Sequence, residues 1–600
     1  MEMSSNTLDT GCEYHVSITG DDSNPGSASA PLRTVQAAAM LAQPGDTVTV
    51  HEGIYRERVD PPRGGESDEK RIVYRAAPGE NVAIKGSEVA KGWERQNGDV
   101  WLLHLPNDYF GAFNPYANML TGDWFFPLDR EHHTGAVYLN DQAMDEAATL
   151  DELFGQCRGR KWFGKSDNAG TWIWANFRGT DPNGQLVEIN KRRTVFYPAK
   201  PGINYITVRG FTLSQAATPW SPPTTEQIGL IGTNWSKGWT IENNTITHSR
   251  CSGVTLGKYF DREDGLNRYG YNAHFQTVKR VLADGSWTPE NVGSHIVRNN
   301  HIAYCEQTGI VGSHGAAFST VTGNVIHDIH VRCLFSGFEQ AGIKFHAPVD
   351  TTIGNNLIYR STKAIWLDWM TQGARVTGNL FYDNREFDLF VEVSHGPFLV
   401  DNNIFLSDVA LLDSSQGGAY AHNLFVGKVQ QRAEPDRLTQ YFKPHSTELV
   451  DVAKVLDGDD RFYNNIVVED SGLQSYDKSV EPLSMGGNVF LGKAKACKLE
   501  QDPLFAPTAD TRFWVQKDGN EVVLEMHLDQ AWGSARQRQL VTTELLGKPE
   551  LVKQAFDNPD GTPLRVDTDY FGNPRNPANP FPGPIELPIT TSKTKVWPAR

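Results

Sequence analysis

The chain has 600 residues and a formal net charge of −16. This length exceeds that of one ordinary globular domain, although solenoid proteins run longer. The acidic balance disfavours nucleic acid and anionic membrane surfaces as partners, and it also disfavours polyanionic substrates such as pectate.

Further features of the sequence indicate the cellular compartment of the protein and whether it holds a metal ion or a cofactor. No hydrophobic run approaches the 18 residues that a membrane-spanning helix needs. Residues 1–6 lack the basic and apolar regions of a secretory signal, so the sequence predicts a cytoplasmic protein. The six cysteines form no CxxC pair, and Cys251, Cys305 and Cys333 fall within repeats, where we expect them to be buried. We therefore expect neither a metal ion nor a cofactor.

The N-terminal segment, residues 1–89, is predicted to form a cap and the first coils of a solenoid. A turn-rich stretch at 20–26 precedes an Ala-rich run at 35–42 that is typical of a short helix. Strand patterns follow at 47–50 and 53–55. A helix in this position can cover the open end of a solenoid, which otherwise exposes apolar surface and unpaired strands.

Residues 90–200 interrupt the pattern and are rich in aromatic side chains. Alternating segments at 137–139 and 172–177 favour antiparallel strands. We interpret this segment as an inserted β-sandwich.

A short repeat then dominates the chain. Its unit is an Asn followed by an apolar pair, and several steps are about 24 residues long. The Asn positions are Asn244, Asn300, Asn324, Asn356, Asn379, Asn403, Asn423, Asn465 and Asn488. A fixed period in this range indicates a solenoid, and the β-branched and aromatic runs favour strands. Asn tolerates the left-handed turn conformation, and stacked Asn side chains can hydrogen-bond along a column.

The sequence therefore predicts an all-β protein whose main element, residues 201–495, is a right-handed parallel β-helix. The alternative is a β-propeller, but its blades need roughly 40 residues or more, which the shorter period disfavours. Residues 496–600 contain a strand-like run at 521–526 and a Pro-rich stretch. This C-terminal segment is predicted to pack either on the sandwich or on the flank of the β-helix.

Polar side chains form one column when the coils are aligned. The column contains Ser313, His346, Asp368 and Glu392, with Asp413 or Ser414 next. Since side chains alternate along a strand, residues two positions earlier share the face of this column. This rule places Lys344 and Trp366 beside the column, and it directs Ile365 and Leu367 into the core.

This face has the composition of a sugar site. Asp368 and Glu392 are 24 residues apart, so one coil separates them, and stacked strands lie roughly 4.8 Å apart. Two carboxyl groups about 5 Å apart are what a retaining glycosidase needs. Trp366 could stack on a pyranose ring, and the polar groups could bind hydroxyls. Like charges on neighbouring strands raise one of the two pKa values, but the geometry leaves open which one.

Long strings of this sequence resemble glycoside hydrolase family 120, the β-xylosidases. The resemblance runs from about residue 13 to at least residue 465. Its motifs are the segments 217–220, 234–239, 339–347, 366–369, 390–396, 415–420 and 459–465.

This resemblance implies a parallel β-helix with a flanking β-sandwich, a retaining mechanism and small xylo-oligosaccharides as substrates. By motif, Asp368 is similar to the nucleophile, Glu392 to the acid/base, and Glu339 to a third carboxylate of the pocket. The family is also known to form tetramers, so a homotetramer is expected. The complete set of expected substrate-binding residues is Glu339, Lys344, His346, Trp366, His395 and His314.

The leading hypothesis is an exo-acting enzyme that releases xylose from the non-reducing end of xylobiose and short oligomers, with the sandwich narrowing access. Two alternatives stay open. A β-helix polysaccharide lyase would need a basic side chain for the C5 proton and cations at the uronate, which the acidic column disfavours. A non-catalytic solenoid such as a tailspike would bind xylan fragments unchanged.

Overall fold

The computed structural model describes residues 11–155, 157–265, 270–468, 470–586 and 593–598. The opening residues on which the expected compartment rests lie outside these ranges. The chain divides into two compact units, Met1–Asn267 with Cys305–Gln307 and Arg332–Phe338, and Arg268–Tyr304 with Thr308–Val331 and Glu339–Arg600. The division into four segments stays a prediction, and each unit is described by itself.

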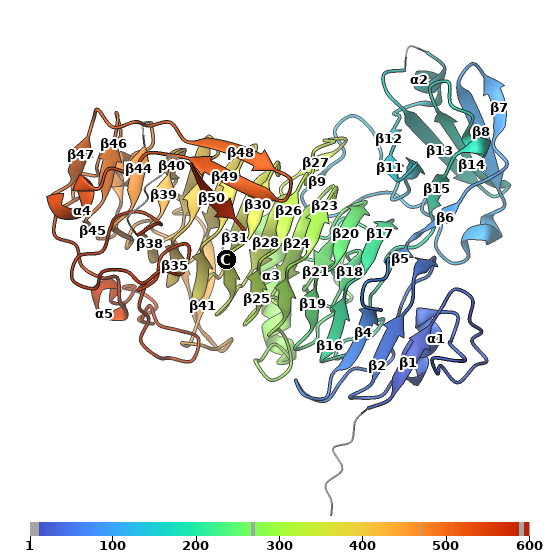
Figure 1. The fold of residues 1–600 in the computed structure, drawn as a ribbon, viewed down its shortest axis with the longest axis horizontal. Helices are drawn as coiled ribbons and strands as arrows, with labels where there is room; N and C mark the ends of the chain where they lie inside the picture. The colour runs from blue at the N-terminus through green and yellow to red at the C-terminus, as the bar shows by residue number, and fades with distance from the viewer. Residues whose placement is uncertain (1–10, 156, 266–269, 469, 587–592, 599–600) are drawn as a thin grey trace, which may run out of the picture. The chain divides into compact units, whose positions relative to one another are not determined.

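The first unit contains the initial coils of the solenoid (Figure 1). Its strands pair in parallel in three stacks, and α1, Val35–Leu41, packs against β1 and β2 as predicted. The stacks are β1 Glu13–Val16, β2 Thr47–Val50, β4 Ile72–Ala76, β16 Ile206–Arg209 and β19 Thr240–Glu242; β3 Gly53–Tyr55, β5 Val82–Lys85, β17 Thr212–Ala216 and β20 Thr245–Ser249; and β18 Ile231–Gly232 with β21 Val254–Thr255.

Two small sheets interrupt these coils. Most of their strand pairs are antiparallel, as expected from the alternating patterns, and Trp162, Ile173 and Val187 lie in their shared core. One sheet holds β6 Ser87–Val89, β10 Val137–Leu139, β11 Gln142–Ala143 and β15 Val187–Asn190. The other holds β7 Glu94–Asn97, β8 Val100–Leu105, β12 Asp145–Glu146, β13 Lys161–Asp167 and β14 Gly170–Asn176, with α2 Leu150–Phe154 beside it. A separate pair joins β9 Phe125–Phe126 to β27 Ser336–Gly337.

The second unit continues the same design, again with three parallel stacks. One holds β22 Ile296–Arg298, β25 Thr320–Thr322, β29 Thr352–Gly354, β32 Ala374–Thr377, β35 Phe398–Asp401, β38 Gly418–Ala421, β43 Arg461–Tyr463 and β45 Ser484–Gly486. Another holds β23 His301–Ala303, β26 Val325–His327, β30 Leu357–Tyr359, β33 Leu380–Tyr382, β36 Ile404–Phe405, β39 Leu424–Phe425, β44 Ile466–Val468, β46 Val489–Leu491 and β47 Leu504–Ala506. The third holds β24 Thr308–Ser313, β28 Ala341–His346, β31 Lys363–Asp368, β34 Phe387–Glu392, β37 Val409–Ser414 and β40 Lys428–Gln431.

A ladder of buried Asn side chains fixes the register of these coils. Asn356 Nδ2 donates to Asn379 Oδ1 at 3.0 Å, and Asn379 Nδ2 donates to Asn403 Oδ1 at 2.9 Å. The same oxygens accept backbone N–H groups of the preceding coil, so each Asn ties two coils together. The residue before a ladder Asn takes the left-handed conformation, as at Asn355 and Gly378. Both the left-handed turn and the ladder are predicted from sequence for the repeated Asn. In the structure two successive residues share these roles: the first makes the turn and the second, the Asn, joins the ladder.

Two insertions in the second unit depart from the coil. The helix α3, Tyr271–Asp284, follows β21 in the chain, and the hairpin of β41 Leu438–Phe442 and β42 Leu449–Lys454 lies within the 42-residue step from Asn423 to Asn465.

The C-terminal segment packs on the flank of the β-helix. The sheet of β48 Trp514–Asp518, β49 Glu521–Glu525 and β50 Lys593–Trp597 buries Val522, Leu524 and Val596 against the β30 and β33 side chains Leu357 and Leu380 (Figure 1). Beyond it lie α4 Ala531–Ala535 and α5 Thr543–Leu546. Of the two placements considered from sequence, the flank is therefore the one observed.

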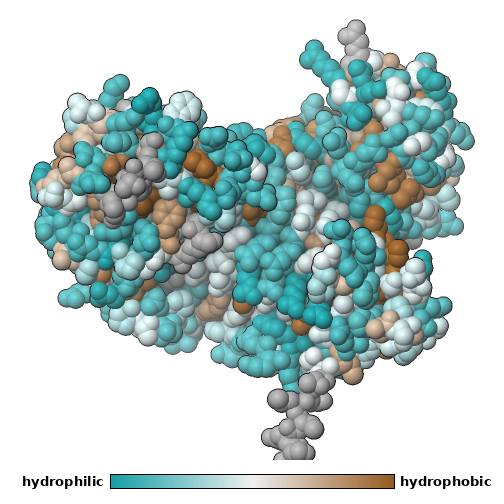
Figure 2. Space-filling view, in the orientation of Figure 1, coloured by the Kyte–Doolittle hydropathy of each residue, from teal (hydrophilic) through white to brown (hydrophobic). Residues whose placement is uncertain are grey.

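The remaining fold predictions have clear outcomes. The parallel coils exclude a propeller. Cys251 and Cys305 are buried, but the prediction for Cys333 is wrong, because that residue is exposed in the segment between β26 and β27 rather than inside a strand. Among the described residues no helix is long and apolar enough to cross a membrane. The face shown in Figure 2 is largely hydrophilic, with hydrophobic residues in scattered groups.

We expect Asn379→Ala to lower the free energy of unfolding by roughly 3 kcal/mol, because it leaves several buried backbone and side-chain groups without partners. Urea unfolding followed by circular dichroism measures this loss. The control is Asn520→Ala in the exposed turn between β48 and β49, which should change stability by less than about 0.5 kcal/mol. Equal effects of the two variants would show that the ladder does not hold the coils in register.

Candidate active site

The predicted polar column exists in the third stack of the second unit. Ser313 pairs with His346, His346 with Asp368, Asp368 with Glu392, and Glu392 with Ser414. Ser414, not Asp413, is therefore the next member of the column. Five strands carry it, and three of them, β24, β28 and β31, lie side by side in Figure 1.

Asp413 lies on the opposite face of its strand. It pairs with the core residue Val391, and its carboxylate accepts hydrogen bonds from the hydroxyls of Tyr420 and Tyr476 at 2.8 and 2.9 Å. Asp413 thus belongs to a buried polar cluster inside the coil.

The alternation of side chains on β31 follows the prediction. Ile365 and Leu367 are fully buried in the core. Trp366 instead lies with Lys344 and donates its indole N–H to Glu392 Oε2 at 3.1 Å. Lys344, Trp366, Asp368 and Glu392 consequently share one face of the sheet.

Asp368 contacts two basic side chains, those of Lys344 and His346. Its Oδ2 lies 2.9 Å from His346 Nε2 and 3.1 Å from Lys344 Nζ. Burial alone would raise the pKa of Asp368, but the charges of His346 and Lys344 outweigh it and hold the pKa well below its usual range. Asp368 Oδ1 is buried and has no hydrogen-bond partner among the described residues. The carboxylate is therefore ionised and keeps one oxygen available.

Glu392 has the opposite tendency, although it lies only one strand away. Burial, together with the negative charge of Asp368, raises the pKa of Glu392 to about 7, and Arg437 opposes this shift. Arg437 Nη1 lies 3.4 Å from Glu392 Oε1. The pair therefore consists of one carboxylate and one carboxyl group that is largely protonated at slightly acidic pH.

Lys344 links this pair to Glu339. Its ammonium group is fully buried and also lies 2.9 Å from Glu339 Oε1. Glu339 Oε2 is buried without a partner among the described residues. The third carboxylate expected from the resemblance is thus adjacent to the pair through one shared cation.

The stacking role considered for Trp366 does not fit its surroundings. Lys344 Nζ lies 3.3 Å from the ring centroid, and the Phe390 ring stacks on the indole at 5.1 Å. Since these groups already occupy the indole, a pyranose cannot lie flat against it. Its N–H hydrogen bond to Glu392 is the contact that joins it to the carboxyl pair.

The other two expected residues, His395 and His314, lie outside the column. His395 is buried beneath the β41–β42 hairpin, with its ring 5.8 Å from Tyr441, and burial lowers the pKa of His395 to about 4. His314 packs against Trp287 at 4.8 Å. Neither histidine shares the column, and their roles in substrate binding stay predictions.

Sequence reasoning missed the residues that the two insertions supply. His274 of α3 packs against His346 at 4.6 Å and against Trp369 at 5.0 Å. Burial lowers the pKa of His274 well below its usual value, so its imidazole is neutral. Arg437 comes from the residue before β41. Both lie outside the repeat, so the alignment of coils contains no signal for them.

Unsatisfied polar atoms gather in this cluster. Besides Asp368 Oδ1 and Glu339 Oε2, these are His346 Nδ1 and His274 Nε2, all buried without partners among the described residues. Buried polar atoms are normally hydrogen-bonded, so such a group is typical of a site whose partners are the hydroxyls of a ligand. Within the described part of the chain, no cluster of three or more His, Cys, Asp and Glu side chains is arranged to hold a metal ion.

Comparisons with known proteins agree with this architecture. Three family models match: the insertion domain of glycoside hydrolase 120 over residues 90–189, the right-handed β-helix region over 228–426, and a family of unknown function, DUF1565, over 18–61. A solved structure described as the complex of XylC with xylose is 40% identical, with a TM-score of 0.93, and the alignment covers 98% of this chain and 100% of that chain.

A curated relative, the uncharacterized protein YwoF of Bacillus subtilis (strain 168), is 40% identical over 81 residues. This match spans 14% of the chain and only 17% of that relative's length.

A parallel β-helix with paired carboxylates, together with these matches, places the chain among the glycoside hydrolases. Given the insertion-domain match and the full-length similarity to XylC, the chain belongs to glycoside hydrolase family 120.

We expect Trp366→Phe to lower kcat/KM on an aryl β-xyloside about tenfold, roughly 1.4 kcal/mol, because it keeps the ring between Lys344 and Phe390 but removes the N–H bond to Glu392. The thermal midpoint should fall by only a few degrees. Leu367→Ala, at the neighbouring core position, should instead cost about 2–5 kcal/mol of stability. Steady-state kinetics and thermal unfolding separate the two. Unchanged kinetics in Trp366→Phe would contradict the role given to the N–H group.

Proposed function

We propose that this protein is a retaining, exo-acting β-xylosidase that releases xylose from the non-reducing end of xylobiose and short xylo-oligosaccharides. The observation that carries the proposal is the contrast between Asp368 and Glu392, which lie on adjacent strands but favour opposite protonation states. Neighbouring strands are spaced by roughly 4.8 Å, which is close to the separation of the two carboxyl groups in retaining enzymes.

In the first half of the reaction, Asp368 is the nucleophile and Glu392 the acid. Asp368 Oδ1 bonds to the anomeric carbon while the glycosidic C–O bond breaks. Glu392 gives its proton to the departing oxygen, so the leaving sugar departs as a neutral alcohol. His346 and Lys344 hold Asp368 Oδ2 and orient the other oxygen towards the sugar.

The second half reverses these roles. The charge of Asp368 is lost in the covalent ester, which removes the repulsion that favours protonated Glu392. Glu392, now a carboxylate, takes a proton from water as the water oxygen bonds to the anomeric carbon. The bond to Asp368 breaks, and xylose leaves with its original β configuration.

Burial of the site supports exo action. Lys344 is fully buried, His346 is 2% exposed and Asp368 is 5% exposed, although all three lie on the outer face of a sheet. Such enclosure suits the end of a chain better than its middle. The similarity to a protein solved with xylose supports xylose as the unit released. A homotetramer and a cytoplasmic location stay predictions.

The substrate-binding residues form the second part of the proposal. Glu339, His346 and His274 present unsatisfied polar atoms that match sugar hydroxyls, and Lys344 joins Glu339 to Asp368. Trp366 acts by donating a hydrogen bond to Glu392, whereas His395 and His314 pack against Tyr441 and Trp287 at the side of the site.

Time-resolved NMR of xylobiose hydrolysis tests the proposed function. We expect the signal of β-xylose to appear first and that of α-xylose to follow only by mutarotation, since two displacements retain the configuration. α-Xylose as the first product would contradict the nucleophilic role of Asp368. A product absorbing in the ultraviolet would indicate a lyase, and unchanged xylobiose would favour the binding solenoid.

Azide rescue tests the roles of the two carboxylates. In Glu392→Ala, an aryl xyloside with a good leaving group can still form the ester, and we expect azide to speed turnover and give β-xylosyl azide. Asp368→Ala forms no ester, so it should not give this β-product. Product analysis by NMR distinguishes the two variants, and β-xylosyl azide from Asp368→Ala would reverse the assignment.

A further inference from the structure

Arg437 reaches the proposed acid/base residue from outside the coil. Its guanidinium lies 3.4 Å from Glu392 Oε1 and 4.9 Å from the centre of the Trp369 ring. The side chain of Arg437 is 23% exposed and that of Glu392 is 13% exposed, so solvent screens this pair only partly. Arg437 thus approaches the oxygen of Glu392 that Trp366 does not bind.

The other charges around Glu392 come from the coil itself. Asp368 on β31 repels a second negative charge, whereas Lys344 on β28 and Arg432 beyond β40 attract it. Lys363 on β31 is also within electrostatic range, but its amine pairs with Glu386 at 2.6 Å. Among the cations that act on Glu392, Arg437 has the largest effect.

The backbone that carries Arg437 is fastened in place. Phe442, at the end of β41, exchanges two hydrogen bonds with the side chain of Gln372, at 2.9 and 3.0 Å. Gln372 in turn donates to Gln554 Oε1 at 2.8 Å. The hairpin is thereby joined both to a coil and to the C-terminal segment.

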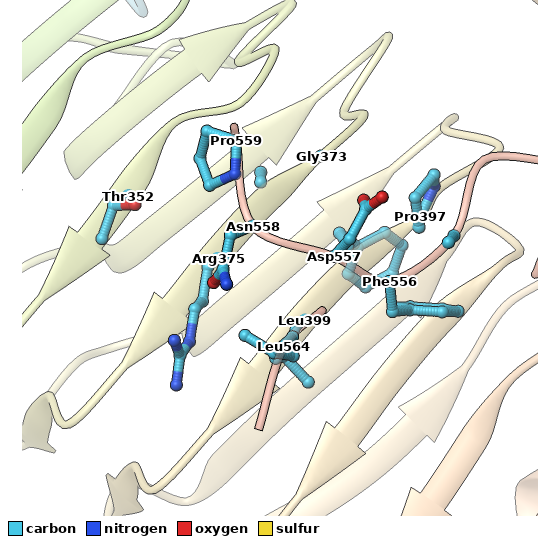
Figure 3. A pocket seen from close by; sticks show the side chains of 13 residues that line it. Thr352, Gly373, Arg375, Pro397, Leu399, Phe556, Asp557, Asn558, Pro559 and Leu564 are labelled. Carbon is cyan, nitrogen blue, oxygen red and sulfur yellow. The ribbon is translucent and has the colours of Figure 1, made fainter. Parts of the chain in front are cut away.

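A second attachment holds the tip of the hairpin. His445 lies between Asp350 at 3.1 Å and Asp557 at 3.3 Å. Figure 3 shows Asp557 on the C-terminal segment where it crosses the strands that carry Arg375 and Leu399. Two anchors therefore restrict the movement of the strand that begins beside Arg437.

We propose that Arg437 is a positioning residue for the reaction: it holds Glu392 by charge and stabilises the carboxylate that forms when Glu392 gives its proton to the leaving sugar. This inference rests on the proposed function. Glu392 must lose a proton in the first displacement and work as a base in the second. A fixed cation at Oε1 stabilises the carboxylate formed in the first step and keeps Glu392 ionised for the second. Without it, Glu392 would keep its proton to higher pH and would be a weaker acid.

The test compares pH profiles of Arg437→Gln with those of the wild type on an aryl β-xyloside. In the wild type we expect kcat/KM to fall as pH rises through about 7, where Glu392 loses its proton. In Arg437→Gln this alkaline limb should move up by roughly half a pH unit to one unit. For a substrate limited by hydrolysis of the ester, the acidic limb of kcat should move up by a similar amount, because Glu392 of the variant becomes ionised only at higher pH.

Two matched variants separate charge from structure. Lys443→Gln removes one positive charge from the same hairpin, where Lys443 pairs with Glu448, and should leave the limb in place. Arg437→Lys keeps the charge and should retain most of the wild-type limb. If Arg437→Gln does not reach the native circular dichroism spectrum, Arg437→Met, which keeps the aliphatic stem over Trp369, replaces it.

The outcomes are distinct from those that test the function. An unmoved limb in an active, folded Arg437→Gln or Arg437→Met overturns the inference while the function stands. A limb displaced equally in Arg437→Lys and Arg437→Gln also overturns it, because charge would then not be the cause. If the wild-type protein shows no xylosidase activity, the proposed function itself is contradicted.

Discussion

The register between successive parallel coils is the constraint on which the rest of the structure depends. Each buried ladder Asn binds the Asn of the next coil and its backbone, so a coil cannot slip by one residue without breaking several buried hydrogen bonds. Because the coils do not slip, residues that are equivalent in sequence become neighbours in space. Asp368 and Glu392 meet for this reason, and their separation follows from the spacing of strands.

Asp368 and Glu392 occupy equivalent positions on successive coils, but their neighbouring residues differ, and so do their pKa values. Asp368 lies beside the coil that supplies Lys344 and His346, whereas Glu392 lies beside Ser414 on its other side. Lys344 and His346 consequently contact Asp368 at 3.1 and 2.9 Å, whereas Arg437 approaches Glu392 only to 3.4 Å. A regular scaffold thus holds an asymmetric electrostatic environment, in which one carboxyl group is ionised and its neighbour retains a proton near neutral pH.

Sequence reasoning succeeded where the repeat applies and failed where it does not. The period and the alternation of side chains were enough to predict the column and the inward direction of Leu367. His274 and Arg437 could not be predicted, because α3 and the β41–β42 hairpin occupy insertions that align with no coil. The face on which Trp366 lies was predicted correctly, but its suggested stacking on a sugar does not fit the structure. Its indole lies between Lys344 and Phe390 of the neighbouring strands, and this contact depends on side-chain rotamers that the sequence pattern does not contain.

The attachment of the hairpin to Gln554 and Asp557 has a consequence for biosynthesis. The coils that carry Asp368 and Glu392 are complete well before the ribosome reaches these residues, and short-range coil stacking can proceed as the chain emerges. The anchors of the segment that brings Arg437 to Glu392 are synthesised only when residues 554 and 557 are reached. A nascent polypeptide would therefore present its two carboxylates before the segment that carries Arg437 is anchored beside them.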